Sequence, residues 1–231
     1  MTAKPRLVIS SGAGISAESG ISTFRDAGGL WEQYPVMDVA SADGFARNPA
    51  LVHRFYNERR ADLGKARPNR AHEILHELEE DFDVYVITQN VDDLHERAGS
   101  TKVLHLHGEL MKVRAVDNPS LLFPVGYDTC TTPDTVIEGH KVRPHIVFFQ
   151  EAVPMFEPAT EIAGSADIFV IVGTSLAVYP AAGLLHYVRA GVPVYYIDPR
   201  PSPVPAGVTV IPLPATEGMA ELARILLKDR R

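Results

Sequence analysis

The chain has 231 residues, of which 45% are hydrophobic and 22% are charged, so it can bury one good core and a small appended module. Its formal net charge of −7 leaves no broad basic face, which argues against nucleic acid and against an anionic membrane surface as partners. The single cysteine, Cys130, excludes an internal disulfide framework, and no segment approaches the about 20 apolar residues of a membrane span. The first residues carry no apolar run ahead of a cleavage site. We therefore expect a cytoplasmic protein, and we expect it to be a monomer.

Short apolar, β-branched runs recur along the chain, and each has the length of a buried strand. They cover residues 7–10, 84–88, 103–105, 146–149, 168–172, 194–197 and 209–211, and helical patterns cover 46–63, 70–80, 181–190 and 216–227. This alternation predicts an α/β fold with a Rossmann-like, doubly wound parallel sheet. Residues 24–48 and 115–142 break the pattern, as functional loops or a small inserted module would.

A glycine-rich segment follows the first predicted strand directly. Gly12, Ala13 and Gly14 open a G-x-G-x-x-G/A pattern, which is typical of loops whose backbone approaches a pyrophosphate at the N-terminus of the next helix. A tight glycine turn without a ligand would give the same pattern. No acidic residue ends a clean second strand about 20 positions further on, which weakens the interpretation as an ordinary dehydrogenase.

Several motifs, taken in chain order, resemble those of the sirtuins. They are residues 12–16 with 20–25, 88–92 and 107–110, followed by 143–149 and 173–175. The resemblance covers nearly the whole chain apart from residues 115–141. It implies a Rossmann-like NAD-binding domain built from residues 1–23, 61–113 and 142–231. Residues 24–60 and 114–141 then supply the cofactor loop, the acyl-pocket helix and a small module, and the whole forms a single catalytic unit.

The family's chemistry is NAD-dependent removal of acyl groups from protein lysine side chains. The acyl carbonyl oxygen attacks the ribose carbon that bears nicotinamide, and a base then activates a ribose hydroxyl that takes the acyl group. The resemblance therefore implies a transferase that uses NAD, acts on acyl-lysine proteins or peptides, and yields nicotinamide, free lysine and O-acyl-ADP-ribose.

His107 matches the family's catalytic histidine, and an imidazole with an ordinary pKa near 6.5 suits a general base at neutral pH. His105 and His107 together could also be metal ligands on one strand face, or plain polar packing. The neighbouring motif with Asn90 and Asp92 favours the base.

The segment after the second predicted strand lies where parallel sheets bind ligands. By resemblance, Gln89 and Asn90 hold ribose hydroxyls or an ordered water, so that Asn90 shares in catalysis, and Asp92 accepts a hydrogen bond from the nicotinamide carboxamide. Asn90 or Asp92 could equally cap the short helix that follows, and both roles can coexist.

The remaining cofactor contacts come from segments far apart in the sequence. The resemblance makes Phe24 the ring beside the scissile bond and Arg25 a ribose or phosphate contact. It makes Gly173, Thr174 and Ser175 a phosphate-binding turn. Asp198 stands where relatives carry an asparagine that contacts the adenosine ribose, and an aspartate there can accept but cannot donate a hydrogen bond. Thr216 is expected near the adenine.

The acyl group is expected to be acidic. Tyr56 and Arg59 share one face of a predicted helix, and a phenol beside a guanidinium can bind a carboxylate. The pair matches the Tyr-x-x-Arg of sirtuins that remove succinyl and malonyl groups, although a solvated basic face would look similar. Val147 and Phe148 match the strand that receives the acyl-lysine, and the alternative is a buried strand. Gln150 replaces a common glycine.

The chain departs from the family at the zinc site, since most sirtuins carry four cysteines there. Residues 115–141 hold Cys130 alone, so we expect no zinc and no other metal. A small apolar core should replace the metal, with Cys130 as a buried filler. Its expected members are Leu121, Leu122, Phe123, Val125, Tyr127, Val136 and Ile137.

Two other functions compete with deacylation. One is an ADP-ribosyltransferase or NAD hydrolase, in which water or another nucleophile intercepts the ribose; Tyr56 and Arg59 argue against it. The other is a non-catalytic sensor that binds NAD or ADP-ribose, and His107 together with Asn90 argues against that.

Overall fold

A computed structural model describes residues 3–22 and 34–228 of the chain. The strands are β1 (Arg6–Ser11), β2 (Asp83–Thr88), β3 (Val103–His105), β4 (Gly108–Ala115), β5 (Leu122–Pro124), β6 (Val136–Ile137), β7 (His140–Ile146), β8 (Ile168–Val172), β9 (Val194–Ile197) and β10 (Val208–Ile211). The helices are α1 (Gly14–Ala17), α3 (Val36–Val39), α4 (Ala42–Arg47), α5 (Pro49–Lys65), α6 (Arg70–Glu77), α7 (Leu94–Ala98), α8 (Phe156–Gly164) and α9 (Ala215–Lys228), with 3₁₀ turns η1 (Leu78–Glu80) and η2 (Ala181–Tyr187). Within these ranges, no helix combines the length and apolar character needed to cross a membrane.

Six strands form a parallel sheet in the order β10-β9-β8-β1-β2-β3. The chain builds one half of this sheet outward from β1 and then returns to build the other half outward from β8. This is the strand order of doubly wound dinucleotide-binding folds, so the predicted Rossmann-like α/β class is confirmed.

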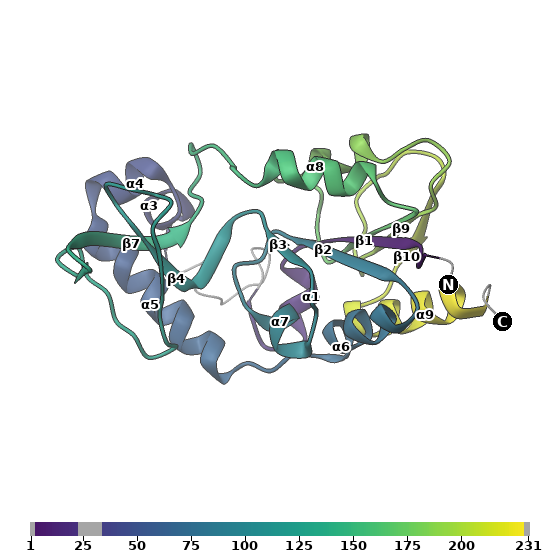
Figure 1. Ribbon diagram of the computed structural model, residues 1–231, viewed down its shortest axis with the longest axis horizontal. Coiled ribbons are helices and arrows are strands. Elements are labelled where there is room, and N and C mark those ends of the chain that lie inside the picture. The colour runs from purple at the N-terminus through teal and green to yellow at the C-terminus, as the bar shows by residue number, and fades with distance from the viewer. Residues whose placement is uncertain (1–2, 23–33, 229–231) are drawn as a thin grey trace.

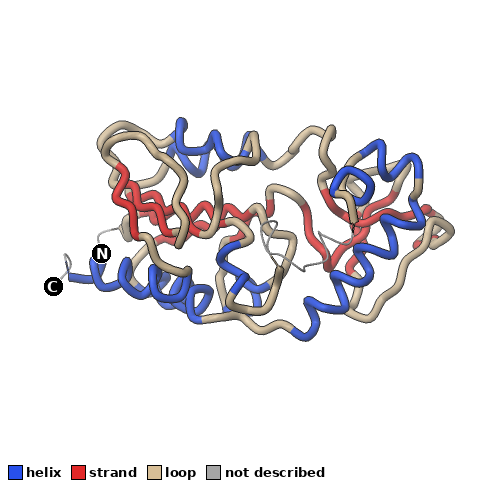
Figure 2. The backbone as a smooth tube through the Cα atoms, turned by 180° about the vertical axis from the view of Figure 1, so that it is seen from behind, coloured by secondary structure: helices blue, strands red, loops and turns tan. Residues whose placement is uncertain are grey.

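Helices cover both faces of the parallel sheet, as Figures 1 and 2 show from opposite sides. Along β1, Leu7 and Ile9 pack into the core shared with α6 and α9, whereas Val8 packs into the core shared with α8 and η2. Because both faces are buried, each strand is apolar almost throughout, and this is the pattern that the sequence displays.

A second, antiparallel sheet in the order β5-β4-β7-β6 lies beside the first and packs against α5 (Figure 1). With α3, α4 and α5 it forms the small module that the sequence predicts. The proposed assignment of residue ranges to the two units remains a prediction. Its boundaries at 113 and 142 fall within β4 and β7.

Two predicted elements differ in the structure. Residues 146–149 do not form a strand of the parallel sheet: β7 ends at Ile146, and Phe149 makes only an isolated bridge to Ser41. The predicted helix over 46–63 is two helices, because Asn48 caps a new helix by accepting a hydrogen bond from the Leu51 N–H, 3.0 Å away, and Pro49 occupies its first turn.

The apolar core expected to replace the zinc site is present only in part. Phe123 packs with Val113, Ala115 and Val142, and Val125 and Ile137 lie against them. Leu121, Leu122 and Val136 are exposed, and Tyr127 packs instead against the α5 side of the module. Cys130 is exposed, so its expected role as a buried filler is wrong.

Buried polar side chains of α5 complete what this small core lacks. Arg60 is fully buried and donates to the carbonyls of Leu110 and Thr129, at 2.8 and 2.7 Å. The amide of Asn57 donates to the carbonyl of Thr131 at 2.8 Å, and its oxygen accepts from the Thr131 N–H at 3.1 Å. One helix thus satisfies backbone groups of the loop around residues 129–131.

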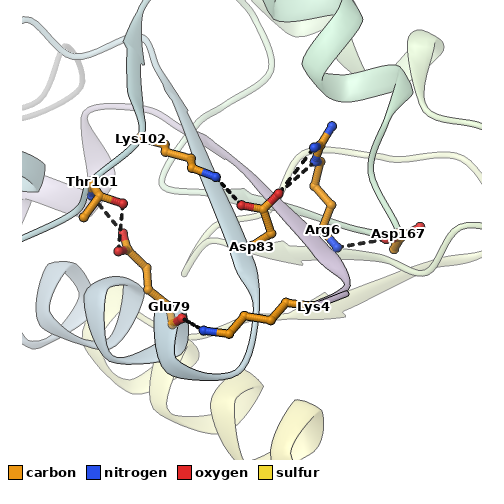
Figure 3. Close-up of polar contacts among 7 residues, drawn as sticks. All are labelled: Lys4, Arg6, Glu79, Asp83, Thr101, Lys102 and Asp167. Carbon is orange, nitrogen blue, oxygen red and sulfur yellow. Dashed lines mark hydrogen bonds and ion pairs between the residues drawn. The ribbon is translucent and has the colours of Figure 1, made fainter. Parts of the chain in front are cut away.

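Charged side chains join the amino-terminal ends of the parallel strands (Figure 3). Asp83 pairs with Arg6 and Lys102, and Glu79 accepts from the backbone and hydroxyl of Thr101. These groups are partly exposed, so each ion pair stabilises the fold by about 1 kcal/mol at most. The opposite edge of the sheet, where the strands end, holds the polar loops described next.

Candidate active site

The chain reverses its direction of sheet building between β1 and β8, and ligands bind at such a switch point beyond the carboxyl ends of the strands. The two predicted phosphate-binding segments follow these two strands directly. The Gly12 N–H donates to the carbonyl of Val172 at 3.0 Å, and the Gly14 N–H donates to that of Gly173 at 2.8 Å. The structure therefore brings residues 12–14 and 173–175 together at one edge.

The glycines are required by the contact between these two turns. A Cβ atom on Gly12 would lie 2.7 Å from Thr174 Cβ, and one on Gly14 would lie 2.7 Å from Gly173 Cα. Gly173 itself has a φ of +64°. The result is a cradle made largely of backbone, as a pyrophosphate requires. Because α1 is only four residues long, the N–H groups of the loop carry this capacity rather than a long helix dipole.

The loop after β2 is held by one buried hydroxyl. Ser16 Oγ accepts from the Asn90 amide at 3.1 Å and donates to Asp92 Oδ2 at 3.0 Å. Gln89 Nε2 donates to Thr174 Oγ1 at 3.3 Å, which links the same loop to the turn after β8. Four of the predicted NAD contacts, Gln89, Asn90, Asp92 and Thr174, are therefore held by side-chain hydrogen bonds at this edge of the sheet.

Asp92 also supports the start of α7, since its Oδ1 accepts from the Leu94 N–H at 3.2 Å. The N-cap residue of the helix is Asp93, so Asp92 lies one position before the cap, and the expected capping role of Asn90 or Asp92 is wrong. Burial raises the pKa of Asp92, although the hydrogen bonds from Leu94 and Ser16 act in the opposite direction. A carboxyl group that is so poorly solvated gains from a new hydrogen-bond donor, such as the N–H of a carboxamide.

His107 lies just before β4, with its ring turned to the loop after β2. Its Nδ1 lies 3.1 Å from the carbonyl oxygen of Gln89, which can only accept, so Nδ1 carries the proton and Nε2 carries the lone pair. Burial lowers the pKa of His107, and the hydrogen bond to Gln89 offsets part of that shift. The ring is therefore neutral and basic at Nε2 at pH 7, as a general base must be.

His105 has different partners from His107. Its Nδ1 donates to the carbonyl of Asn90 at 3.0 Å, and its Nε2 lies 2.7 Å from Glu96 Oε1. Both ring nitrogens are therefore engaged, which argues against the pair as metal ligands. Among the residues that the structure describes, no three His, Cys, Asp or Glu side chains are arranged so that they could hold a metal ion. The absence of zinc stays a prediction that a metal analysis of the purified protein checks.

The predicted acyl-pocket residues lie together on the small module. The rings of Tyr56 and Phe148 stack with their centroids 6.0 Å apart, and both side chains are almost fully buried. The Arg59 guanidinium lies over the Phe55 ring, 5.6 Å from its centroid. Burial lowers the pKa of Arg59, while the charges of Tyr56 and Asp92 oppose that shift. Arg59 is thus close enough to act electrostatically on both the phenol of Tyr56 and the carboxyl group of Asp92.

Val147 is placed directly beside the predicted base. Its N–H donates to the carbonyl oxygen of His107 at 2.9 Å. Gln150, where relatives have glycine, takes a φ of +76°, and its side chain accepts from the Asp43 N–H and donates to the Asp43 carboxylate, at 3.1 and 2.8 Å. These two bonds offset the backbone strain that the glycine would avoid.

The structure describes two of the residues expected to lie near the adenosine end of NAD. Asp198 follows β9, and its Oδ1 accepts from the Arg200 N–H at 2.8 Å, so the second oxygen is the one left for a ribose. Thr216 donates through its N–H and its hydroxyl to the carboxylate of Glu18, at 2.9 and 2.6 Å. Phe24 and Arg25, the other two expected contacts, lie outside the described residues.

Ser16, Arg143 and Glu151 also make contacts in this region, although the sequence motifs predict no role for them. Ser16 has a sequence signal, because it stands inside the glycine motif just after the first strand. Arg143 and Glu151 flank the segment of Val147 and Phe148 and pair with each other, and Glu151 also pairs with Arg114, 37 positions away. No periodic pattern or motif predicts these pairs.

Comparisons with known proteins agree with this geometry. The family model for the Sir2 family matches residues 12–180. A protein of Bacteroides thetaiotaomicron named NAD-dependent protein deacylase is 54% identical and aligns over 96% of this chain and 97% of its own length. A Helicobacter pylori protein of the same name is 48% identical over 96% of this chain and 97% of its own.

Solved structures agree as well. A Sir2 homologue in complex with NAD has a TM-score of 0.86 and 37% identity, covering 98% of this chain and 91% of that one. A Sir2 protein with a deacetylated p53 peptide and 3′-O-acetyl-ADP-ribose has a TM-score of 0.81 and 31% identity, covering 98% and 94%.

Proposed function

Because the chain belongs to the Sir2 family, we propose that this enzyme removes succinyl and malonyl groups, as well as acetyl groups, from lysine side chains. It is an NAD-dependent protein deacylase, as its relatives are named. The observation that carries the finer proposal is Arg59, partly buried on the same face of α5 as Tyr56. A desolvated guanidinium gains more from an incoming carboxylate than an exposed one does, because the local dielectric is low.

NAD, when bound, supplies the ribose carbon that receives the acyl oxygen and the hydroxyl that finally takes the acyl group. His107 accepts the proton of that hydroxyl at Nε2. Asn90, oriented by Ser16, holds a ribose hydroxyl or a water, and Asp92 accepts from the nicotinamide carboxamide. The backbone cradle after β1 and β8 binds the pyrophosphate. Gln89, Ser175, Asp198 and Thr216 contribute to the ribose, phosphate and adenosine contacts. Phe24 is proposed to shield the scissile bond, and Arg25 to contact a ribose or phosphate.

The acyl-lysine enters between the two sheets. Val147 and Phe148 are proposed to receive its backbone as an added strand, which puts the acyl chain between His107 and the wall formed by Phe148 and Tyr56. The bond between the Val147 N–H and the His107 carbonyl supports this arrangement, because it couples the peptide-binding segment to the base. The enzyme acts on acyl-lysine proteins as a cytoplasmic monomer, without nucleic acid or a membrane.

Replacing Arg59 tests the proposed acyl preference. In Arg59→Met the kcat/KM for a succinyl-lysine peptide should fall by about tenfold to a hundredfold, because the charge-assisted hydrogen bonds to the acyl carboxylate are lost. The kcat/KM for the matching acetyl-lysine peptide should change little. Arg54→Met, on an exposed position of the same helix, is the matched control and should alter neither rate. An equal fall for both peptides in Arg59→Met would contradict the carboxylate-binding role.

A further inference from the structure

We propose that Glu151 is a positioning residue for the acyl-lysine, because one carboxylate ties the backbone of Phe148 to two arginines on different strands. Its Oε2 accepts from the Phe148 N–H at 2.9 Å. Its Oε1 lies 2.7 Å from Arg143 Nη1, on β7, and its Oε2 lies 3.1 Å from Arg114 Nη2, on β4. The inference rests on the proposed role of Val147 and Phe148 in receiving the acyl-lysine.

Arg143 extends this link from the backbone of Phe148 to its ring. The guanidinium carbon lies 4.0 Å from the Phe148 centroid and 4.8 Å from that of Phe45. Phe148 in turn stacks on Tyr56. Glu151 therefore fixes the plane of Arg143, and Arg143 fixes the aromatic wall of the acyl pocket. The Glu151 carboxylate thus positions both the backbone and the side chain of Phe148.

The other side of the same segment is bound to the small module. The Phe149 N–H donates to the carbonyl of Ala40 at 2.8 Å, and the carbonyl of Phe149 accepts from the Ala42 N–H at 3.1 Å. The Val147 N–H already donates to His107. Three successive N–H groups, at 147, 148 and 149, are therefore bound by three different partners, and the middle one is bound by a side chain. A side-chain partner can be altered by substitution without touching the backbone.

The groups around Glu151 keep its carboxyl group ionised. Burial acts to raise its pKa, but the hydrogen bonds and charges of Arg143 and Arg114 outweigh that effect and lower the pKa. The carboxylate is therefore ionised at neutral pH and accepts from all three donors together. A glutamine at this position has only one accepting atom and cannot serve both arginines and the Phe148 N–H.

The test compares Glu151→Gln with Glu157→Gln, an exposed glutamate in the first turn of α8. We expect the KM for an acetyl-lysine peptide to rise about tenfold in Glu151→Gln, because charge-assisted hydrogen bonds are lost. The KM for NAD and the Glu157→Gln control should stay near the wild-type values. A peptide KM within about twofold of wild type in a folded Glu151→Gln protein would overturn the proposal.

Two further variants separate positioning from a general loss of structure. Arg143→Lys keeps the charge but loses the planar contact with Phe148, so it should raise the peptide KM in the same direction. Combining Glu151→Gln with Arg143→Lys should raise the peptide KM no further than the more affected single variant does, as expected for groups that act as a unit. Fully additive effects would overturn the proposal. If Glu151→Gln does not fold, Arg114→Gln decides: about a threefold rise in peptide KM supports the proposal, and no rise overturns it.

Amide hydrogen exchange separates this inference from the proposed function. The amides of residues 147–149 are already hydrogen-bonded in the free enzyme, so peptide binding should protect them further by reducing local opening of this segment. Absent protection would overturn the proposed peptide-binding segment, and the inference with it. Protection together with an unchanged peptide KM in Glu151→Gln would overturn the inference alone. The assay uses an acetyl-lysine peptide, so its outcome does not depend on whether the enzyme prefers succinyl groups.

Discussion

His105 and His107 lie two positions apart in the sequence, and their partners shift their pKa values in opposite directions. Each donates through Nδ1 to a backbone carbonyl of the loop after β2. Burial acts to lower the pKa of both. Glu96 reverses the shift at His105 and raises its pKa, whereas the pKa of His107 stays lowered. A carboxylate partner therefore distinguishes the two imidazoles.

The pH dependence of catalysis follows from the lowered pKa of His107. A base with a lowered pKa stays neutral to a lower pH, so kcat/KM for the peptide should hold across neutral pH and fall only below about 6.5, as Nε2 becomes protonated. A pH profile of kcat/KM at saturating NAD measures this. Glu96→Gln, which removes the partner of His105, should leave the acid limb where it is. An acid limb above pH 7 would contradict the assignment.

At the scale of elements, α5 contributes to two parts of the small module. Tyr56 and Arg59 belong to the acyl pocket proposed above, whereas Asn57 and Arg60 donate to backbone carbonyls of the loop around Thr131. Only four buried residues form the apolar core of this part of the described module, so these hydrogen bonds help to order the loop. The helix that carries the proposed pocket residues thus also supports the module.

Removing Arg60 should therefore destabilise the protein strongly. Arg60→Met leaves the buried carbonyls of Leu110 and Thr129 without their donor, and we expect the free energy of unfolding to fall by about 3 kcal/mol. Urea unfolding measures the loss. Arg54→Met, on the exposed side of α5, should change the free energy by less than about 0.5 kcal/mol. A loss in Arg60→Met as small as in the control would show that the anchoring is not needed.

The sequence predicts the strands of the parallel sheet because the central ones, such as β1 and β8, are buried on both faces and therefore read as apolar runs. It predicts the glycine turns because their residue types have few other uses. Hydrophobic periodicity alone does not reveal that Asn48 and Pro49 divide the helix over 46–63. The run over 146–149 is apolar because Phe148 is buried in the core of the small module rather than in a sheet. Arg143 and Glu151 have no motif signature, because their contacts with each other, with Arg114 and with Phe148 form only in the folded chain.

At the scale of the whole molecule, the two sheets divide the work between cofactor and substrate. The edge of the parallel sheet holds the backbone cradle and the loop with Asn90 and Asp92, and the small module holds the proposed acyl pocket. His107 lies between them, after β3 of one sheet and before β4 of the other. A base at this junction can act on a bond formed between ligands of the two units, which is what acyl transfer requires.

The most direct test of this account is mass spectrometry of the products formed from acetyl- and succinyl-lysine peptides with NAD. We expect unmodified lysine peptide, nicotinamide and O-acyl-ADP-ribose in equal amounts. We also expect His107→Ala to bind NAD but to form no O-acyl-ADP-ribose. Release of nicotinamide together with free ADP-ribose, or with ADP-ribose attached to protein, while the peptide stays acylated, would contradict deacylation with His107 as the base.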